Sequence, residues 1–205
     1  MPIERQLVFH DCFNPAIALP YELRQLDFEG AMQDVYDFFF DVNSFLIAKN
    51  LPRLEETLRA ANLSGTVSDM LTVSLAKHSR TLVQNRLHNA HPDLIVQGKY
   101  PNDQIKSGEH GVEIKSTTKR GGAVDTHGAR KQTMCVFVYE VDKTTEPAVD
   151  RASLTFTQVY IAEVVPEDFR KNARGDLGTR TATLHAEGVK KLRERWVYLD
   201  PSPVI

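Results

Sequence analysis

Two carboxylates and one amine are the side chains of this chain whose types and spacing could do chemistry together. Asp93 opens an apolar run, and twenty residues later Glu113 and Lys115 lie two apart in a second run with an alternating pattern. Side chains two apart in a strand leave the same face, so Glu113 and Lys115 share one face and their apolar neighbours point to the other. Two carboxylates can hold a divalent cation, and a neighbouring amine can orient or help deprotonate a water molecule.

The order Pro92-Asp93 followed by Glu113-Ile114-Lys115 resembles the PD-(D/E)xK nuclease superfamily, which includes most type II restriction endonucleases. This resemblance implies hydrolysis of phosphodiester bonds, with Mg²⁺ bound by Asp93, Glu113 and the main-chain carbonyl of Ile114. It also implies that Lys115 positions the attacking water. The competing interpretation of the same residues is a surface ion pair at the end of a strand.

The resemblance covers about residues 91–142, and the chain departs from it just upstream. In this family the helix before the first core strand often supplies another acid to the metal site, yet Asp69 is the only carboxylate between residues 68 and 90. The identity of a further metal ligand from the upstream residues therefore stays open. The other upstream residues that could join the site are Glu55, Glu56, Gln84 and Asn85. Asp103 and Glu109 are less suited, because no apolar run holds their loop in place.

Basic residues interleaved with hydroxyls and glycines follow Lys115 directly, and a second basic cluster surrounds Gly175 and Gly178. This composition suits phosphate binding, because small residues allow close approach, hydroxyls donate hydrogen bonds and cations neutralise charge. The residues expected to contact DNA are Lys119, Arg120, His127, Arg130, Lys131, Arg174 and Arg180. A solvated turn is the alternative for both segments, and a packed histidine at a helix start is the alternative for His127.

The charge of the chain is uneven, although its formal net charge is only −2. Residues 1–70 carry 5 basic and 11 acidic side chains, whereas residues 71–205 carry 20 and 16. An acidic face is a poor place to dock a phosphate backbone, so DNA binding is expected from the second part of the chain.

Length and composition suit one domain with a sizeable core, since the 205 residues are 41% hydrophobic and 25% charged. Cys12 and Cys135 lie far apart in the sequence, and neither a signal peptide nor an apolar run long enough to span a bilayer is evident. We therefore expect a reduced, cytoplasmic protein with no membrane partner.

The motifs of several other enzyme classes are missing. The chain has no Gly-rich phosphate loop ending in Lys-Ser or Lys-Thr, no Cys-x-x-Cys and no Gly-x-Ser-x-Gly. His10 with Cys12, and His88 with His91, are too sparse for a structural zinc site. Cys135 lies in a run of Val and Phe, which predicts a buried, inert thiol.

The spacing of apolar residues predicts the elements that position these groups. Helices are predicted over residues 28–46, 52–65, 68–89 and 186–195, with a short helix or turn over 125–132 and a short helix from Pro166. Strands are predicted over residues 93–96, 111–117, 135–141, 154–165, 179–184 and 196–199, and a loop over 97–111. The first helix has an acidic face of Asp34, Asp37 and Asp41, which we interpret as solvated.

These elements predict an α/β fold with a restriction-endonuclease-like core, in which helices flank a mixed central sheet. The core is assigned to residues 91–205, and residues 1–90 form a mainly helical N-terminal part of the same domain.

The activity expected is that of a magnesium-dependent type II restriction endonuclease that cuts both strands of double-stranded DNA. A double-strand cut at a symmetric sequence needs two active sites and the chain holds one copy of the motif, so we expect a homodimer. The apolar face of residues 28–46 serves either as the contact between the two copies or as part of the core. Two other classes stay open, a DNA repair or structure-specific nuclease and a non-catalytic DNA-binding module on the same fold.

Overall fold

A six-stranded sheet forms the centre of the structure, a computed structural model that describes residues 4–87, 89–171 and 181–201. The strands lie in the order β1-β2-β3-β5-β6-β9. Their bounds are β1 Leu82–Gln84, β2 Leu94–Val96, β3 Gly111–Thr117, β5 Gln132–Glu140, β6 Thr155–Val164 and β9 Trp196–Leu199. β3 and β5 run parallel and the other neighbouring pairs run antiparallel. The predicted mixed central sheet is therefore confirmed.

A smaller sheet and four α-helices complete the described fold. The smaller sheet has the order β4 (Asp125–Thr126), β8 (Ala182–Leu184) and β7 (Phe169–Lys171). The helices are α1 (Gln25–Ala48), α2 (Leu54–Thr57), α3 (Ala60–His78) and α4 (Ala186–Glu194). Short 3-10 turns lie at His10–Cys12, Pro20–Glu22, Pro101–Asp103, Ala148–Asp150 and Pro166–Asp168.

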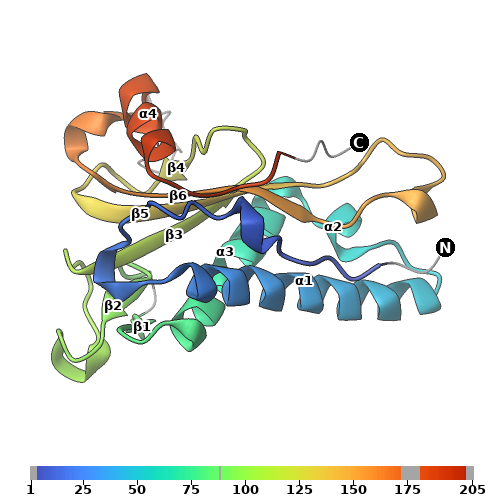
Figure 1. The fold of residues 1–205 in the computed structure, drawn as a ribbon, viewed down its shortest axis with the longest axis horizontal. Coiled ribbons are helices and arrows are strands. Elements are labelled where there is room, and N and C mark those ends of the chain that lie inside the picture. The colour runs from blue at the N-terminus through green and yellow to red at the C-terminus, as the bar shows by residue number, and fades with distance from the viewer. Residues whose placement is uncertain (1–3, 88, 172–180, 202–205) are drawn as a thin grey trace, which may run out of the picture.

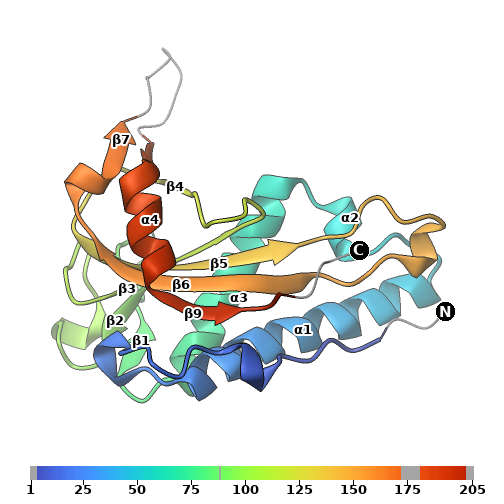
Figure 2. The same ribbon diagram turned by 45° about the horizontal axis from the view of Figure 1, so that its top comes forward.

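The central sheet is covered on both faces. In Figure 1, α1 and α3 lie below the sheet and α4 lies above it, and the turned view in Figure 2 keeps this arrangement. In β5, Phe137 and Tyr139 pack into the core shared with α1 and α3, while Val136 and Val138 pack into the core beneath α4 and the smaller sheet. A strand covered on both faces is buried along its length, which explains why this part of the sequence is continuously apolar.

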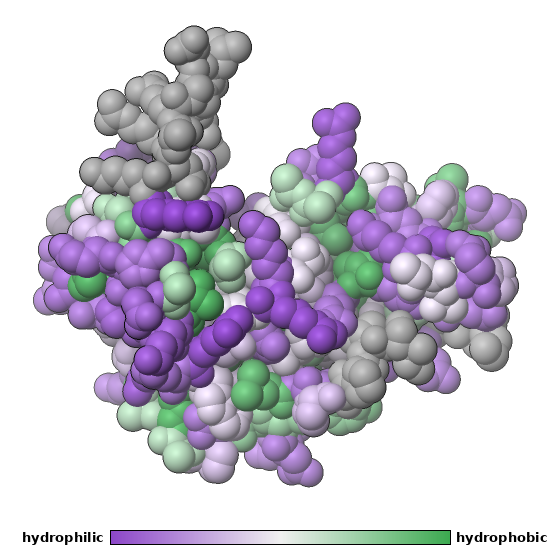
Figure 3. All heavy atoms as spheres, turned by 90° about the horizontal axis from the view of Figure 1, so that it is seen from above, coloured by the Kyte–Doolittle hydropathy of each residue, from purple (hydrophilic) through white to green (hydrophobic). Residues whose placement is uncertain are grey.

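The outer surface on the α4 side is mainly hydrophilic. Figure 3 looks onto this face, and apolar side chains form small separate groups between the polar ones. Scattered apolar side chains of this kind are ordinary on the surface of a folded protein.

Helix α1 confirms the helix predicted over residues 28–46 and uses its apolar face within the chain. Phe28, Met32, Val35 and Phe39 are each at most 2% exposed. The ring of Phe28 lies beside that of Phe137 in β5, at a centroid distance of 6.2 Å. Most of the apolar face therefore packs against the chain's own core.

The acidic face of α1 is paired as well as solvated, so the expectation that it is simply solvated was only partly correct. Lys77 Nζ and His78 Nε2 on α3 each lie 2.9 Å from Asp34 Oδ2. Arg5 pairs with Asp37 and Asp41. These contacts attach α3 and the N-terminal segment to α1.

The helix predicted over residues 68–89 was placed wrongly. Helix α3 ends at His78, and the residues after it form strand β1, which pairs antiparallel with β2. Ser79 Oγ accepts hydrogen bonds from the backbone N–H groups of Thr81 (3.2 Å) and Leu82 (3.0 Å), which redirects the chain. Pairing with β2 therefore overrides the helical spacing of the leucines in this segment.

Three other element predictions also differ from the structure. The helix predicted over 52–65 is divided between the single turn α2 and the start of α3, and Gly65 lies inside α3 rather than beyond a helix end. Residues 125–132 hold the start of β5 and the two-residue strand β4 rather than a helix. The strand over residues 179–184 is also predicted to lie at a sheet edge, but β8, which lies within it, has β4 on one side and β7 on the other.

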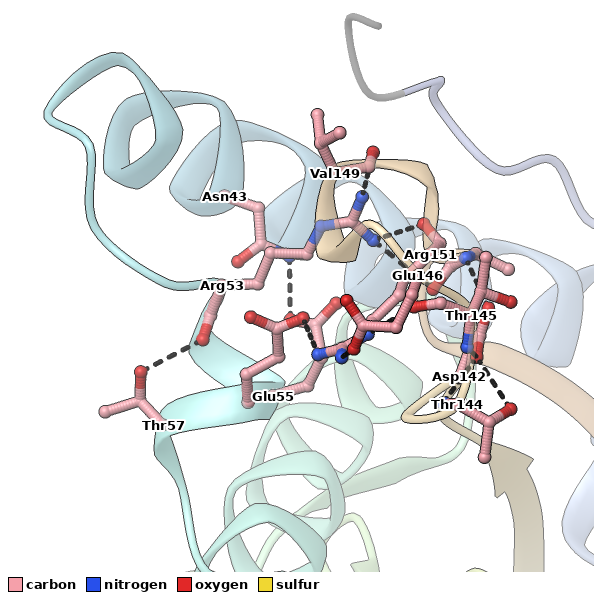
Figure 4. A network of polar contacts seen from close by, with 12 residues as sticks. Asn43, Arg53, Glu55, Thr57, Asp142, Thr144, Thr145, Glu146, Val149 and Arg151 are labelled. Carbon is pink, nitrogen blue, oxygen red and sulfur yellow. Dashed lines mark hydrogen bonds and ion pairs between the residues drawn. The ribbon is translucent and has the colours of Figure 1, made fainter.

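A polar network joins α1, α2 and the connection between β5 and β6 (Figure 4). Arg53 Nη1 donates to the Arg151 carbonyl at 2.6 Å, and Asn43 Nδ2 donates to Glu55 Oε2 at 2.7 Å. The Leu54 backbone N–H donates to Asn43 Oδ1 at 2.8 Å. Buried polar groups need such partners, so this network fixes the end of the molecule where α2 lies.

No helix in the described ranges combines the length and the apolar character that a membrane crossing requires.

Candidate functional site

The candidate site lies where strand β2 begins, because residues of β3 beyond its pairing with β2 have one edge open. β2 pairs with β3 only through Leu94↔Val112 and Ile95↔Gly111, whereas β5 pairs with β3 from Val112 to Thr117. Gly111 allows β2 to approach, because a Cβ atom there would lie 1.9 Å from the Leu94 carbonyl oxygen. Beyond this pair, the second half of β3 has a strand on one side only.

Asp93 directly precedes β2, and its side chain continues the hydrogen bonding along the open edge of β3. The Ile114 backbone N–H donates to Asp93 Oδ2 at 2.8 Å. The N–H and C=O groups of one strand residue point to the same side, so the Ile114 carbonyl is also directed to this edge. The three expected metal ligands Asp93, Glu113 and the Ile114 carbonyl therefore come from one short stretch of sheet.

Glu113 is the buried centre of this cluster. It is 2% exposed, and its carboxylate lies between Lys115 Nζ at 2.6 Å and His91 Nδ1 at 3.0 Å. Because a carboxylate only accepts hydrogen bonds, His91 Nδ1 carries the proton of this contact. Ile114 is 1% exposed and points into the opposite core, as the alternation predicted.

The two carboxylates titrate differently because their neighbours differ. Burial and the nearby Glu113 carboxylate raise the pKa of Asp93 to about 6. Burial alone would raise the pKa of Glu113, but the hydrogen bond from His91 and the charge of Lys115 outweigh it and hold that pKa below its ordinary value. Burial opposes the charge of Lys115, yet the two carboxylates raise the pKa of the amine, so it stays protonated at neutral pH.

The segment that carries Asp93 is held in place by Asn85, which follows strand β1. The Asn85 backbone N–H donates to the Asp93 carbonyl at 2.9 Å. Its side-chain amide donates to the carbonyls of Pro92 (3.1 Å) and Ile105 (2.8 Å). The sequence did not assign these structural roles to Asn85 or His91, although His91 directly precedes the Pro-Asp pair.

Two adjoining clefts of about 980 and 530 Å³ open onto the cluster. Both are lined by Asp69, Thr72, Asp93, Lys115 and His127. Helix α3 supplies one wall, the β1–β2 connection a second, and the segment around β4 a third. The site is therefore accessible to a ligand larger than a single ion.

The upstream residues that were considered as further metal ligands lie in two different parts of the structure. Asp69 lines both clefts, and Gln84 and Asn85 line the larger one. Glu55 binds Asn43 and Glu56 binds Arg151 in the network of Figure 4. Asp69 is therefore the upstream carboxylate that faces the same space as Asp93.

The residues expected to contact DNA fall into three groups. His127 lines both clefts, and Arg130 donates to the His127 carbonyl at 2.5 Å. Lys119 is exposed on the turn after β3 and lines neither cleft, while Arg120 pairs with Glu140 and Lys131 with Glu163. Arg174 and Arg180 lie outside the described residues.

The donor set fits Mg²⁺ even though it is small. Within the described ranges, His, Cys, Asp and Glu side chains form no group of three that could hold a metal ion. Mg²⁺, however, is commonly bound by one or two carboxylates and keeps several waters. The negative charge of Glu113 contributes to the raised pKa of Asp93, so the two carboxylates repel each other, although the Lys115 cation lies beside them. A divalent cation would relieve that repulsion, so the residues present suit it.

No protein-family model matches this chain, and no curated protein is significantly similar to it.

Proposed function

We propose that this chain is a magnesium-dependent DNA endonuclease with a restriction-endonuclease-like core, and that it makes double-strand cuts as type II restriction endonucleases do. The observation that carries the proposal is the cluster of Asp93, Glu113 and Lys115 at the open edge of β3, in which Glu113 is buried and Asp93 and Lys115 line an accessible cleft. The mixed sheet flanked by helices is compatible with such a core.

Asp93, Glu113 and the Ile114 carbonyl would hold the metal, and Asp69 is the upstream carboxylate that lines both clefts with Asp93. When bound, Mg²⁺ supplies electrostatic stabilisation of the charge that develops on the phosphate. The protein's own contribution is to hold these oxygens in place, because the Ile114 N–H fixes Asp93 and His91 fixes Glu113.

Lys115 would orient the attacking water rather than deprotonate it. Its amine stays protonated beside Glu113, so it can donate hydrogen bonds to a water molecule and to a phosphate oxygen but cannot accept a proton. His127, exposed in the same cleft, is placed to contact the DNA backbone.

A DNA-binding module without cleavage is the second candidate. It is favoured by the small number of acidic and histidine side chains near Asp93 within the described residues, and by the ion pair that already engages Glu113.

Incubation of the purified protein with phage DNA and magnesium, followed by sequencing of the fragment ends, tests the proposal. We expect fragmentation that stops when magnesium is chelated, with one short sequence recurring at the ends. An Asp93→Ala preparation purified in parallel must leave the DNA intact, which excludes a contaminating nuclease. Intact DNA with the wild-type protein would reject the nuclease, and ends without a shared sequence would favour a repair or structure-specific enzyme.

A further inference from the structure

The wall of the larger cleft that faces α3 is formed by the last residue of β1 and by the connection that follows it, and the chemistry described so far uses none of their exposed side chains. Gln84, Arg86 and Leu87 line the cleft that Asp93 and Lys115 also line. All three are exposed. Side chains in this position would contact the part of a bound ligand that lies next to the cluster of Asp93 and Lys115.

We propose that Gln84, Arg86 and Leu87 read the bases next to the phosphodiester bond that the site cleaves. The inference rests on the proposed nuclease function and adds to it the residues that determine sequence specificity. It places part of the recognition surface in a short segment between β1 and β2, separate from the basic segments expected from the sequence.

The chemistry of these side chains matches the edges of bases. An arginine fork binds guanine O6 and N7, an amide binds adenine N6 and N7, and an apolar side chain contacts the thymine methyl group. Arg86 has no hydrogen-bond or ion-pair partner within the described part of the chain, so its guanidinium is free to bind a ligand. Leu87 is 38% exposed, and Val73 on the opposite wall is 56% exposed.

The backbone ties this segment to the catalytic cluster. Asn85 lies between Gln84 and Arg86, and its N–H donates to the Asp93 carbonyl at 2.9 Å. The Asn85 side chain also receives a hydrogen bond from the Ile105 N–H at 3.2 Å. Residues on either side of such an anchor keep a fixed distance from Asp93, so any base that they read must neighbour the cleaved bond.

Arg86 could instead contact a phosphate, and the two roles leave different signatures. A lost base contact changes the preference at one base pair, whereas a lost phosphate contact weakens binding to all sequences and lowers the salt slope by about one. Arg86→Lys separates them further, because lysine keeps the charge but lacks the fork that binds guanine at two points.

The test is selection of bound duplexes from a randomised pool, without magnesium, by wild type, Arg86→Ala, Arg86→Lys, Gln84→Ala and Leu87→Ala. Arg80→Ala is the matched control, since Arg80 is an exposed arginine just before β1 that lines neither cleft. We expect both Arg86 variants to lose about 10- to 100-fold of the preference at one position near the cut, with an unchanged salt slope. The control should keep the wild-type preference.

A uniform loss of binding by Arg86→Ala with full preference in Arg86→Lys would overturn the inference in favour of a phosphate contact. Wild-type preferences in all four cleft variants would overturn it as well. In both cases wild-type cleavage with magnesium would persist, so the nuclease proposal would stand. If the wild-type protein neither binds nor cleaves DNA, both proposals fall together.

Discussion

Asp93 is the residue at which the fold carries an electrostatic cost. Its carboxylate is partly buried beside the buried Glu113 carboxylate, and Lys115 offers both acids a permanent positive charge. Protein interiors disfavour such uncompensated charge, and functional sites are where it is commonly kept. Burial and repulsion by Glu113 raise the pKa of Asp93, and this makes the stability of the fold depend on pH.

Asp93→Asn should stabilise the metal-free protein at high pH. A pKa raised from its usual value of about 4 to about 6 means that ionisation of Asp93 opposes folding, so its stabilising contribution is complete below pH 4 and is lost as the pH rises through 6. Asparagine removes that loss and can still accept the Ile114 N–H. We expect the variant to gain about 2 kcal/mol at pH 8 and little at pH 4, by thermal melts in a chelator. A variant less stable than wild type at both pH values would contradict this.

The pairing of Glu113 with Lys115 could be predicted from the sequence, because side chains two apart in a strand share a face. The contact between His91 and Glu113 could not, since it depends on how β2 and β3 approach. Similarly, Arg120 was assigned to DNA for its charge alone, and its partner Glu140 lies on another strand. The DNA-binding role of Arg120 stays a prediction.

At the scale of elements, helix α3 joins the core to the site. Leu63, Val67, Leu71 and Leu75 are buried against the sheet, while Asp69 on the exposed side lines both clefts. Two glycines lie in the long helices with opposite surroundings. A Cβ at Gly65 of α3 would meet nothing within 4 Å, whereas one at Gly30 of α1 would lie 2.8 Å from the His78 ring.

Gly65→Ala should therefore stabilise the protein and Gly30→Ala should destabilise it. Alanine in an exposed helix interior is favoured over glycine by about 0.5–1 kcal/mol, which corresponds to a rise in Tm of roughly 1–4 °C for Gly65→Ala. At Gly30 the gain in helix propensity is outweighed by the loss of the contact between His78 and Asp34, because the added methyl group forces the His78 ring to move. Calorimetry of the two variants measures whether each substitution raises or lowers the Tm. Equal shifts would mean that the space around the two glycines does not differ.

Element prediction succeeded where one face of an element is buried along its whole length. Helix α1 has apolar residues at alternating four- and three-residue spacing, and no competing pattern interrupts it. The prediction for the segment around Leu82 failed because the spacing of its leucines fits a helix. Thr81 and Val83 favour a strand, but that strand forms only with β2 beside it. Such pairing depends on residues distant in the sequence, so local spacing could not reveal it.

At the scale of the whole molecule, the sheet divides the core into two parts, and the apolar face of α1 belongs to one of them. Most of that face is therefore unavailable to a second copy. In the proposed nuclease, one cluster of Asp93, Glu113 and Lys115 would serve one strand of DNA, so a double-strand cut would still call for two chains.

We predict a homodimer in the presence of duplex DNA. Light scattering should give a mass near twice 23.1 kDa for the protein, plus that of the bound DNA, and plasmid should be converted to the linear form. A protein mass near 23.1 kDa with and without DNA, together with nicking of one strand, would argue for a monomer and for the repair or nicking class.

The most direct test of the central claim is plasmid cleavage by wild type, Asp93→Asn and Glu113→Gln, with Glu109→Gln as the control in the exposed loop before β3. These substitutions keep the size of the side chain and one acceptor oxygen, replace the other oxygen by an NH₂ donor, and remove one negative charge. We predict that wild type and the control cut only when magnesium is present. Both site variants should be more than about 100-fold slower, the loss that even an outer-shell partner of a metal can cause. Cleavage at the wild-type rate by either variant, or cleavage without a divalent metal, would contradict the assignment.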